Sequence, residues 1–177
     1  SAHVYDIPPK YLPTDEMHPL RLNNTYTTTK LLGERLCQLY FENHGLSYTT
    51  LRLFNAYGPG QARGYFIPDM LERARHEDIA LSNGATTKDF VHIDDVTRAF
   101  VLALETPFVG AINIGTGVET ALMDVARQIA VPVGRGFTNA PVKPTATRMC
   151  ADIHRAKRVL GWEPTITIEE GLRGLCD

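Results

Sequence analysis

Stretches with a helical spacing of apolar residues alternate along this chain with short stretches rich in β-branched and aromatic residues. A predicted helix at 25–44 is followed by a predicted strand at 47–54, which reads SYTTLRLF. Further strands are expected at 79–81, 89–93 and 111–114. Because helical and extended segments alternate, the sequence predicts an α/β fold.

Caps and helix breakers assign the rest of the chain. Asp94 or Asp95 is placed to cap the helix that follows the strand at 89–93. Pro59 and three glycines predict that regular structure stops within 55–64, and 131–147 is expected to be irregular. The other expected helices lie at 67–77, 96–104, 119–130, 152–160 and 168–175.

Charge and cysteine content exclude several classes of protein. Eighteen basic and 20 acidic residues give a net charge of −2, which argues against a nucleic-acid-binding protein. No apolar run approaches the roughly 20 residues of a membrane helix, and residues 1–10 do not resemble a signal peptide. Cys37, Cys150 and Cys176 form no CxxC pair, so we expect neither disulfides nor structural zinc, and a cytoplasmic location.

Tyr26 and Lys30 form a Tyr-x-x-x-Lys pair that lies on one face of the first predicted helix. A free tyrosine has a pKa near 10, and an adjacent ammonium group favours the phenolate that could act as a base. A chain with seven tyrosines and five lysines contains about 0.2 such pairs by chance. An amphipathic helix with one aromatic residue and one solvated lysine is therefore the alternative interpretation.

Other motifs for phosphate or metal binding are incomplete. Residues 112–117 (INIGTG) imitate a dinucleotide-binding turn, but Thr120 occupies the position of the third glycine. His92 and Asp94 have an H-x-D spacing, which a strand end followed by a helix cap explains. We therefore expect no metal site.

Taken together, six motifs in a fixed order resemble the extended short-chain dehydrogenase/reductase family, the NAD-dependent sugar-nucleotide epimerases and dehydratases. The resemblance covers the whole chain and concerns the C-terminal part of that family. The motifs are Ser1-Ala-His-Val-Tyr5, Tyr26-x-x-x-Lys30-Leu-x-Gly-Glu34, Leu51-Arg-Leu-Phe-Asn-Ala-Tyr-Gly-Pro-Gly-Gln61, Lys88-Asp-Phe-Val-His-Ile-Asp-Asp95, Asn113-Ile-Gly-Thr-Gly117 and Ala151-Asp-Ile-His-Arg-Ala-Lys-Arg-Val-Leu-Gly-Trp-Glu-Pro164.

The resemblance implies the C-terminal part of a Rossmann-type fold, with the N-terminal glycine-rich half absent. Residues 1–177 would hold the end of the dinucleotide-binding sheet, comprising the catalytic serine, the Tyr-x-x-x-Lys helix and the following strand. These would be interleaved with a small substrate-binding domain at about 60–90 and 115–177. The family also implies a homodimer formed through the helix that carries Tyr26 and Lys30.

The family assigns chemical roles to matching residues. Tyr26 would be the acid/base, Lys30 would hold the nicotinamide ribose and lower the tyrosine pKa, and Ser1 would bind the reacting oxygen. Tyr26, Lys30 and Leu53 would contact the cofactor, which is NAD, with NADP not excluded. Epimerisation of a nucleotide-diphosphate sugar through a transient keto-sugar is the implied reaction.

Substrate contacts follow from the same resemblance. Asn55 matches the residue that contacts the nucleotide sugar. Lys88 stands where the family usually has the arginine that holds the diphosphate, and lysine offers a point charge in place of a bidentate fork. A second basic residue is expected within 143–148, where Pro144-Thr-Ala replaces the usual Pro-Gly-Asp. We select Arg148, for which phosphate binding and a solvated surface position both stay open.

Ala2 and His3 stand where the related 4,6-dehydratases carry Asp-Glu. The absence of this Asp-Glu pair favours epimerase or reductase chemistry over elimination. His3 could be an additional acid/base, because imidazole titrates near neutrality, or could simply line the pocket.

Three functions compete at this point. The first is an NAD-dependent nucleotide-sugar epimerase, of which the 177 residues alone would be inactive. The second is an N-terminally truncated, non-catalytic relative that binds a sugar nucleotide or a protein. The third is an NAD(P)-dependent keto-sugar reductase.

Overall fold

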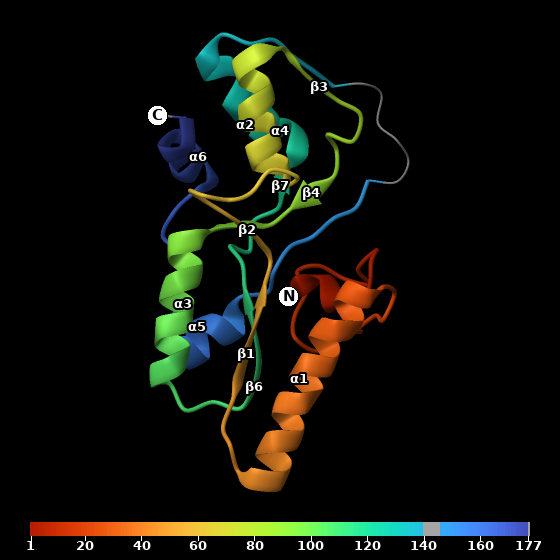
Figure 1. Cartoon of the computed structure of the whole chain (residues 1–177), viewed down its shortest axis with the longest axis vertical. Coiled ribbons are helices and arrows are strands. Elements are labelled where there is room, and N and C mark those ends of the chain that lie inside the picture. The colour runs from red at the N-terminus through yellow and green to blue at the C-terminus, as the bar shows by residue number, and fades with distance from the viewer. Residues whose placement is uncertain (140–145, 177) are drawn as a thin grey trace.

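The computed structural model describes residues 1–139 and 146–176, which form an elongated molecule (Figure 1). Its helices are α1 (Thr25–His44), α2 (Phe66–His76), α3 (Ile93–Glu105), α4 (Leu122–Ala130), α5 (His154–Leu160) and α6 (Ile168–Cys176), with single 3₁₀ turns η1 (Ala2–Val4) and η2 (Val131–Val133). Its strands are β1 (Thr49–Leu53), β2 (Asn55–Tyr57), β3 (Ile79–Leu81), β4 (Thr87–Lys88), β5 (Phe90–His92), β6 (Gly110–Ile114), β7 (Thr120–Ala121) and β8 (Phe137–Asn139).

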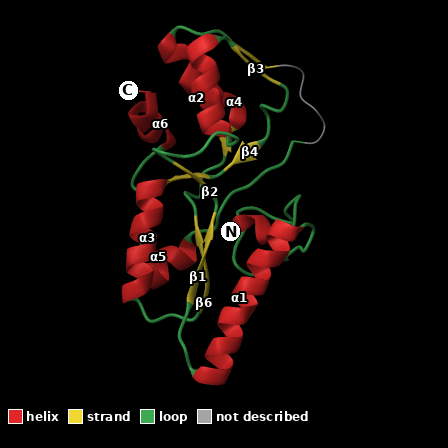
Figure 2. Cartoon of the chain, in the orientation of Figure 1, coloured by secondary structure: helices red, strands yellow, loops and turns green. Residues whose placement is uncertain are grey.

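The strands form short pairs that the helices cover (Figure 2), as the α/β prediction required. β1 runs parallel to β6, with Thr49 opposite Gly110 and Leu53 opposite Ile114. β2–β5 and β3–β8 are also parallel, whereas β4–β7 is antiparallel. β1 and β2 are separated only by Phe54, so one extended segment leads from the first pair into the second.

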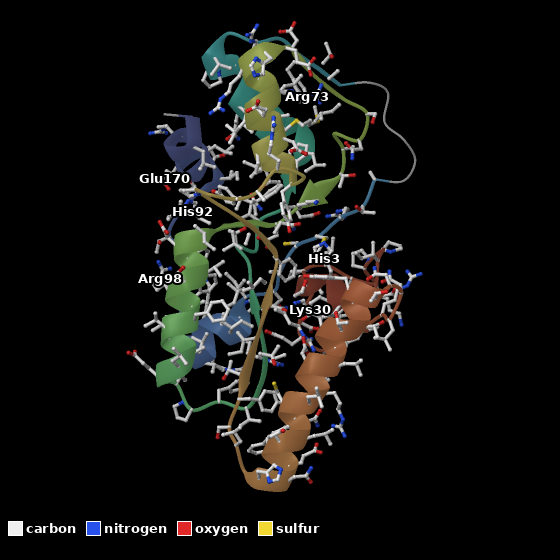
Figure 3. All side chains as sticks on the ribbon, in the orientation of Figure 1. His3, Lys30, Arg73, His92, Arg98 and Glu170 are labelled. Carbon is white, nitrogen blue, oxygen red and sulfur yellow. The ribbon has the colours of Figure 1, made fainter. Side chains whose placement is uncertain are left out.

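One hydrophobic core lies between the β1–β6 pair and the helices α3 and α5. Its largest member is Trp162, which is completely buried and donates its indole N–H to the carbonyl oxygen of Asp95 at 2.9 Å. The buried Asp95 carboxylate accepts hydrogen bonds from the backbone N–H groups of Thr165 and Ile166 and pairs with Arg98 at 2.8 Å. Arg98 itself lies on α3 (Figure 3). This network joins the first turn of α3 to the C-terminal segment.

A second core joins α2, α4 and α6 to the strands β3 and β5. α4 has a strongly amphipathic sequence, and its apolar side is fully enclosed. The buried α4 residues are Leu122, Val125, Ala126, Ile129 and Ala130. Packing against α2 and α6 therefore orders this end of the molecule.

α1 has well-formed ends and little apolar burial. At its start, Asn24 and Thr27 form a reciprocal capping box, and at its end Gly45 adopts φ 68°, the left-handed conformation that glycine allows. Thr27 is the one α1 residue that is buried. The apolar side chains along α1 are mostly exposed, among them Leu32, Leu36, Tyr40 and Phe41.

The helix predictions are confirmed to within a few residues, and three strand or cap predictions are wrong. Asn55–Tyr57 forms β2, where an end of regular structure was expected, because it pairs with β5. Phe137–Asn139 forms β8 beside β3, inside a stretch expected to be irregular. The N-cap of α3 is His92, whose Nδ1 accepts a hydrogen bond from the Asp94 N–H at 3.3 Å.

Within residues 1–139 and 146–176, no helix is long and apolar enough to span a membrane. The same residues bring no three His, Cys, Asp or Glu side chains together as a metal site. Cys37 and Cys150 carry free thiols.

Candidate active site

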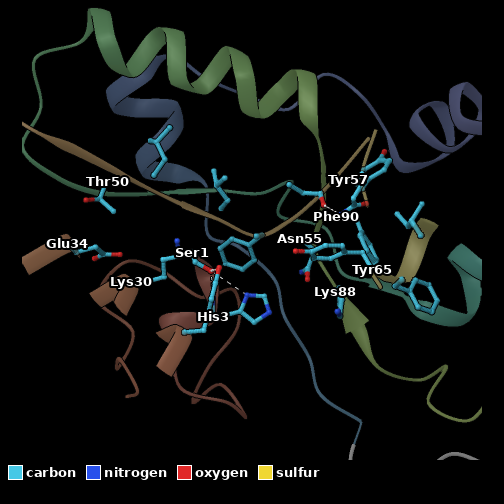
Figure 4. A pocket seen from close by; sticks show the side chains of 18 residues that line it. Ser1, His3, Lys30, Glu34, Thr50, Asn55, Tyr57, Tyr65, Lys88 and Phe90 are labelled. Atoms are coloured by element: carbon cyan, nitrogen blue, oxygen red, sulfur yellow. Dashed lines mark hydrogen bonds between the residues drawn. The ribbon is translucent and has the colours of Figure 1, made fainter. Parts of the chain in front are cut away.

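A cavity of about 650 Å³ lies between the N-terminal loop, the start of α1 and the strands β1, β2, β4 and β5 (Figure 4). Ser1, His3 and Lys30 lie on one side of it, while Lys88 and Tyr65 lie on the other. Six of the seven site residues expected from the sequence line this one cavity: Ser1, Tyr26, Lys30, Leu53, Asn55 and Lys88.

The first side of the cavity holds Tyr26, Ser1 and Lys30. The Tyr26 hydroxyl donates a hydrogen bond to Ser1 Oγ at 3.2 Å. Lys30 Nζ lies 5.4 Å from the centroid of the Tyr26 ring, because four residues of helix place the two side chains on one face. Tyr26 is about half exposed, so its hydroxyl is open to the cavity.

The Lys30 ammonium makes no ion pair or hydrogen bond to any residue that the structure describes. A lysine beside a tyrosine that faces a cavity is free to donate to a ligand with oxygen acceptors, such as a ribose. The residues present therefore fit the role that the family gives them towards a nicotinamide ribose.

Asn55 lies where the chain passes from β1 into β2. Its side-chain amide donates to the carbonyl oxygen of Asp89 at 3.1 Å, which fixes the side chain while its remaining face lines the cavity. Leu53, two residues earlier, supplies part of the apolar wall. This segment therefore offers one polar and one apolar contact to a ligand.

Lys88 is the basic group on the opposite side of the cavity. Its side chain is half-buried, and this burial lowers the pKa of its ammonium group below the usual value. No acidic residue within the described parts of the chain forms an ion pair with it. A half-buried cation without a counter-ion provides a favourable position for an anionic ligand group.

Asp89, the residue after Lys88, holds the backbone around this side of the cavity in place. Its buried carboxylate accepts hydrogen bonds from the N–H groups of Thr116, Gly117 and Ala151 and from the Thr116 hydroxyl. Burial raises the pKa of the Asp89 carboxyl, and these donors oppose that effect. The contacts fix β4 and β5 against the β6–β7 turn and against residue 151.

Arg148, the seventh expected residue, does not line the cavity. Its guanidinium forms a two-point ion pair with Glu119, which also accepts a hydrogen bond from Thr87 Oγ1 at 2.6 Å. This ion pair lowers the pKa of Glu119. Arg148 therefore occupies an exposed position with its own counter-ion, and Lys143 lies outside the described residues.

The sequence did not single out the ion pair between α1 and β1. Glu34, one turn after Lys30, accepts hydrogen bonds from the buried Arg52 guanidinium at 2.7–3.3 Å. Arg52 also donates to the Tyr5 hydroxyl at 3.1 Å, and burial raises the pKa of Tyr5 to about 12. The four-residue spacing places Glu34 on the same face of α1 as Lys30, but it could not reveal the ion pair, because the partner Arg52 comes from β1.

Comparison with known proteins shows the family of this chain. The family model described as "NAD dependent epimerase/dehydratase family" matches residues 1–115, and the chain belongs to this family. The family uses NAD(P). A putative UDP-glucose 4-epimerase of Methanocaldococcus jannaschii is 34% identical over 175 residues, which cover 93% of this chain and 56% of that protein. The chain therefore spans little more than half the length of such relatives.

Solved structures of nucleotide-sugar epimerases and dehydratases are similar to this chain over a similar share of their length. The UDP-glucose 4-epimerase of Thermotoga maritima, solved with UDP-glucose, matches with a TM-score of 0.81 and 31% identity, over 93% of this chain and 56% of that one. The dTDP-glucose 4,6-dehydratase of Bacillus anthracis, solved with NAD, matches with a TM-score of 0.86 and 26% identity, over 98% and 58%. The recognised family and the α/β fold are thus both confirmed.

Proposed function

We propose that this chain carries the catalytic and substrate-binding residues of an NAD-dependent nucleotide-sugar epimerase, with Tyr26 as acid/base. The observation that supports this most directly is the arrangement of the Tyr26 hydroxyl, Ser1 Oγ and Lys30 Nζ on one side of a cavity. We further propose the domain division given above, in which about 60–90 and 115–177 serve mainly the substrate.

Each catalytic residue has a separate task in this proposal. The Lys30 charge stabilises the Tyr26 phenolate, which takes the proton from a sugar hydroxyl. The Ser1 hydroxyl hydrogen-bonds the same reacting oxygen and orients it. When bound beside Lys30 and Leu53, a nicotinamide cofactor supplies the hydride acceptor and donor. Tyr26 then returns the proton after the keto-sugar has rotated in the cavity to present its other face.

The anionic part of the substrate is assigned to the other side. Lys88 would bind a phosphate oxygen of the nucleoside diphosphate, and Asn55 would hydrogen-bond the sugar nucleotide. Among the described lining residues the one carboxylate is Glu34, and Arg52 already engages it. The cavity therefore lacks a free carboxylic acid for the elimination of water, which favours epimerisation over dehydration.

The test separates chemistry from binding in the complete gene product with UDP-sugars as probes. Tyr26→Phe should lower kcat by at least about 100-fold and leave KM nearly unchanged, because only the proton-transferring oxygen is lost. Tyr11→Phe, the same change at an exposed position that does not line the cavity, is the matched control and should leave kcat and KM unchanged. Wild-type turnover in Tyr26→Phe would contradict the assignment.

Lys88→Ala should raise KM while kcat stays nearly constant, because a phosphate contact is equal in the ground and transition states. Lys88→Arg should retain binding. Equal affinity of wild type and Lys88→Ala for the nucleoside diphosphate would remove Lys88 from the site. Tight binding of a UDP-sugar without turnover in the wild type would favour the non-catalytic alternative.

A further inference from the structure

Three groups on one side of the cavity form a continuous chain of hydrogen-bonding atoms. The Tyr26 hydroxyl donates to Ser1 Oγ at 3.2 Å, and Ser1 Oγ lies 3.5 Å from His3 Nδ1. The His3 ring stands edge-on to the Tyr26 ring, with centroids 6.2 Å apart and an interplanar angle of 89°. A dashed line joins Ser1 and His3 in Figure 4.

The backbone holds His3 in this position. The residues on either side, Ala2 and Val4, are completely buried, so the 3₁₀ turn that contains them is anchored. The His3 N–H also donates to Ser1 Oγ at 3.4 Å. His3 itself is exposed and lines the cavity, and its Nε2 has no protein partner among the described residues.

The charges around His3 favour a neutral imidazole. Partial desolvation lowers the pKa of His3 below the ordinary value of 6.5, and the positive charge of Lys88 acts in the same direction. Tyr26 on α1 is the other titratable group that faces the ring. A neutral imidazole with its proton on Nε2 can accept the Ser1 hydroxyl proton at Nδ1.

Resting on the proposed function, we propose that His3 is a proton-relay residue, which connects the Tyr26 hydroxyl to solvent through Ser1. When Tyr26 has taken the substrate proton, its O–H bond breaks and Ser1 Oγ gains that proton. In the same step the Ser1 hydroxyl, turned from the reacting oxygen towards His3, loses its original proton, which forms an N–H bond at His3 Nδ1. His3 then releases its Nε2 proton to water, and the reverse sequence restores the phenol for the second half of the reaction.

The kinetic test uses two variants of the complete gene product. Glutamine at position 3 can still accept a hydrogen bond from Ser1 but cannot bind a proton, so it separates relay from structure. His3→Gln should lower kcat by about tenfold with KM unchanged, and should remove the fall in kcat that protonation of His3 causes in the wild type at acidic pH, below its lowered pKa. His3→Ala should be equally slow and should regain activity when imidazole is added.

A second measurement does not need turnover. The imidazole titration of His3 is followed by NMR, with His3→Gln to assign its signal among the six histidines. In Ser1→Ala the hydrogen bond to the neutral ring is lost, so the His3 pKa should rise towards its ordinary value. An unchanged His3 titration in Ser1→Ala would overturn the relay whatever the enzyme does.

The two proposals fail in distinguishable ways. An active wild type in which His3→Gln keeps the same kcat and the same pH profile would overturn the relay and leave the epimerase assignment intact. No epimerisation by the wild type, together with the expected shift in Ser1→Ala, would overturn the assigned reaction while the hydrogen-bonded chain stands.

Discussion

α1 is the longest helix within the described residues, and α4 is one of the shorter ones. The shorter helix nevertheless buries more of its residues than the longer one. α1 has 20 residues and buries one of them, whereas α4 has nine and buries five. α4 is therefore ordered by apolar packing, while α1 depends on its caps and on polar contacts. The difference shows that helix length here says little about what stabilises the helix.

The contact between α1 and β1 is largely an ion pair. Glu34 and Arg52 side chains are 16% and 7% exposed, so their pairing is mostly shielded from water. Within the described residues, β1 pairs with β6 along one edge only. Its other side faces α1 across a groove with Leu20, Leu22 and Leu32 in its walls.

We interpret this exposed side as the place where further structure of the complete protein packs. The relatives that match this chain are nearly twice as long, and the family resemblance predicts both an upstream half and a dimer contact on α1.

The largest expected effect comes from breaking the ion pair. Arg52→Ala should lower the free energy of unfolding by about 3–5 kcal/mol, because it leaves the Glu34 charge largely buried without a partner. Arg35→Ala, which removes the exposed pair with Glu42, is the control and should cost less than about 1 kcal/mol. Urea denaturation measures both, and similar losses would show that the buried pair does not hold α1.

The next largest loss of stability is expected from a leucine-to-alanine change in α4, which is compared with the same change in α1. Leu122→Ala in α4 should cost about 2–5 kcal/mol, since Leu122 is 3% exposed in a packed core. Leu36→Ala in α1 should cost less than about 0.5 kcal/mol, since Leu36 is 56% exposed. Both are measured on the dilute 177-residue chain, and an equal loss would contradict the exposed placement of α1.

The smallest effect on unfolding should accompany a large effect on association. At higher concentration the 177-residue chain should associate through the apolar face of α1. Changing Leu32, Leu36 and Tyr40 together to Lys should abolish this association and change the unfolding free energy by less than about 0.5 kcal/mol. Sedimentation measures the association. A wild-type chain that stays a monodisperse monomer at the higher concentration would remove the association proposal.

The parts of the molecule that follow from local signals were predictable. Asn24 and Gly45 mark the ends of α1, and the four-residue spacing placed Tyr26 and Lys30 on one face. Ser1 joined them only through the family resemblance, because no local rule brings the first residue beside a later helix. His92 was missed as a cap because the two aspartates after it are stronger capping residues by type.

The parts that depend on distant partners were not predictable. β2 exists because β5 supplies its hydrogen bonds, although Asn55, Pro59 and the nearby glycines argue locally against a strand. The pairing of Arg148 with Glu119 and of Arg52 with Glu34 likewise depends on how separate segments meet. Long-range pairing overrides local preference at each of these positions.

The hydrogen bonds to Asp89 and Asp95 have a consequence for the order in which this chain becomes native. Asp89 contacts Ala151, 62 residues later, and Asp95 contacts Thr165, 70 residues later. The hydrogen bonds to both carboxylates can form only when these later residues are in place, and closing such long loops is slow. During synthesis, α1 can therefore form around Tyr26 and Lys30 early, whereas the Lys88 side of the cavity is completed only after the last quarter of the chain has emerged.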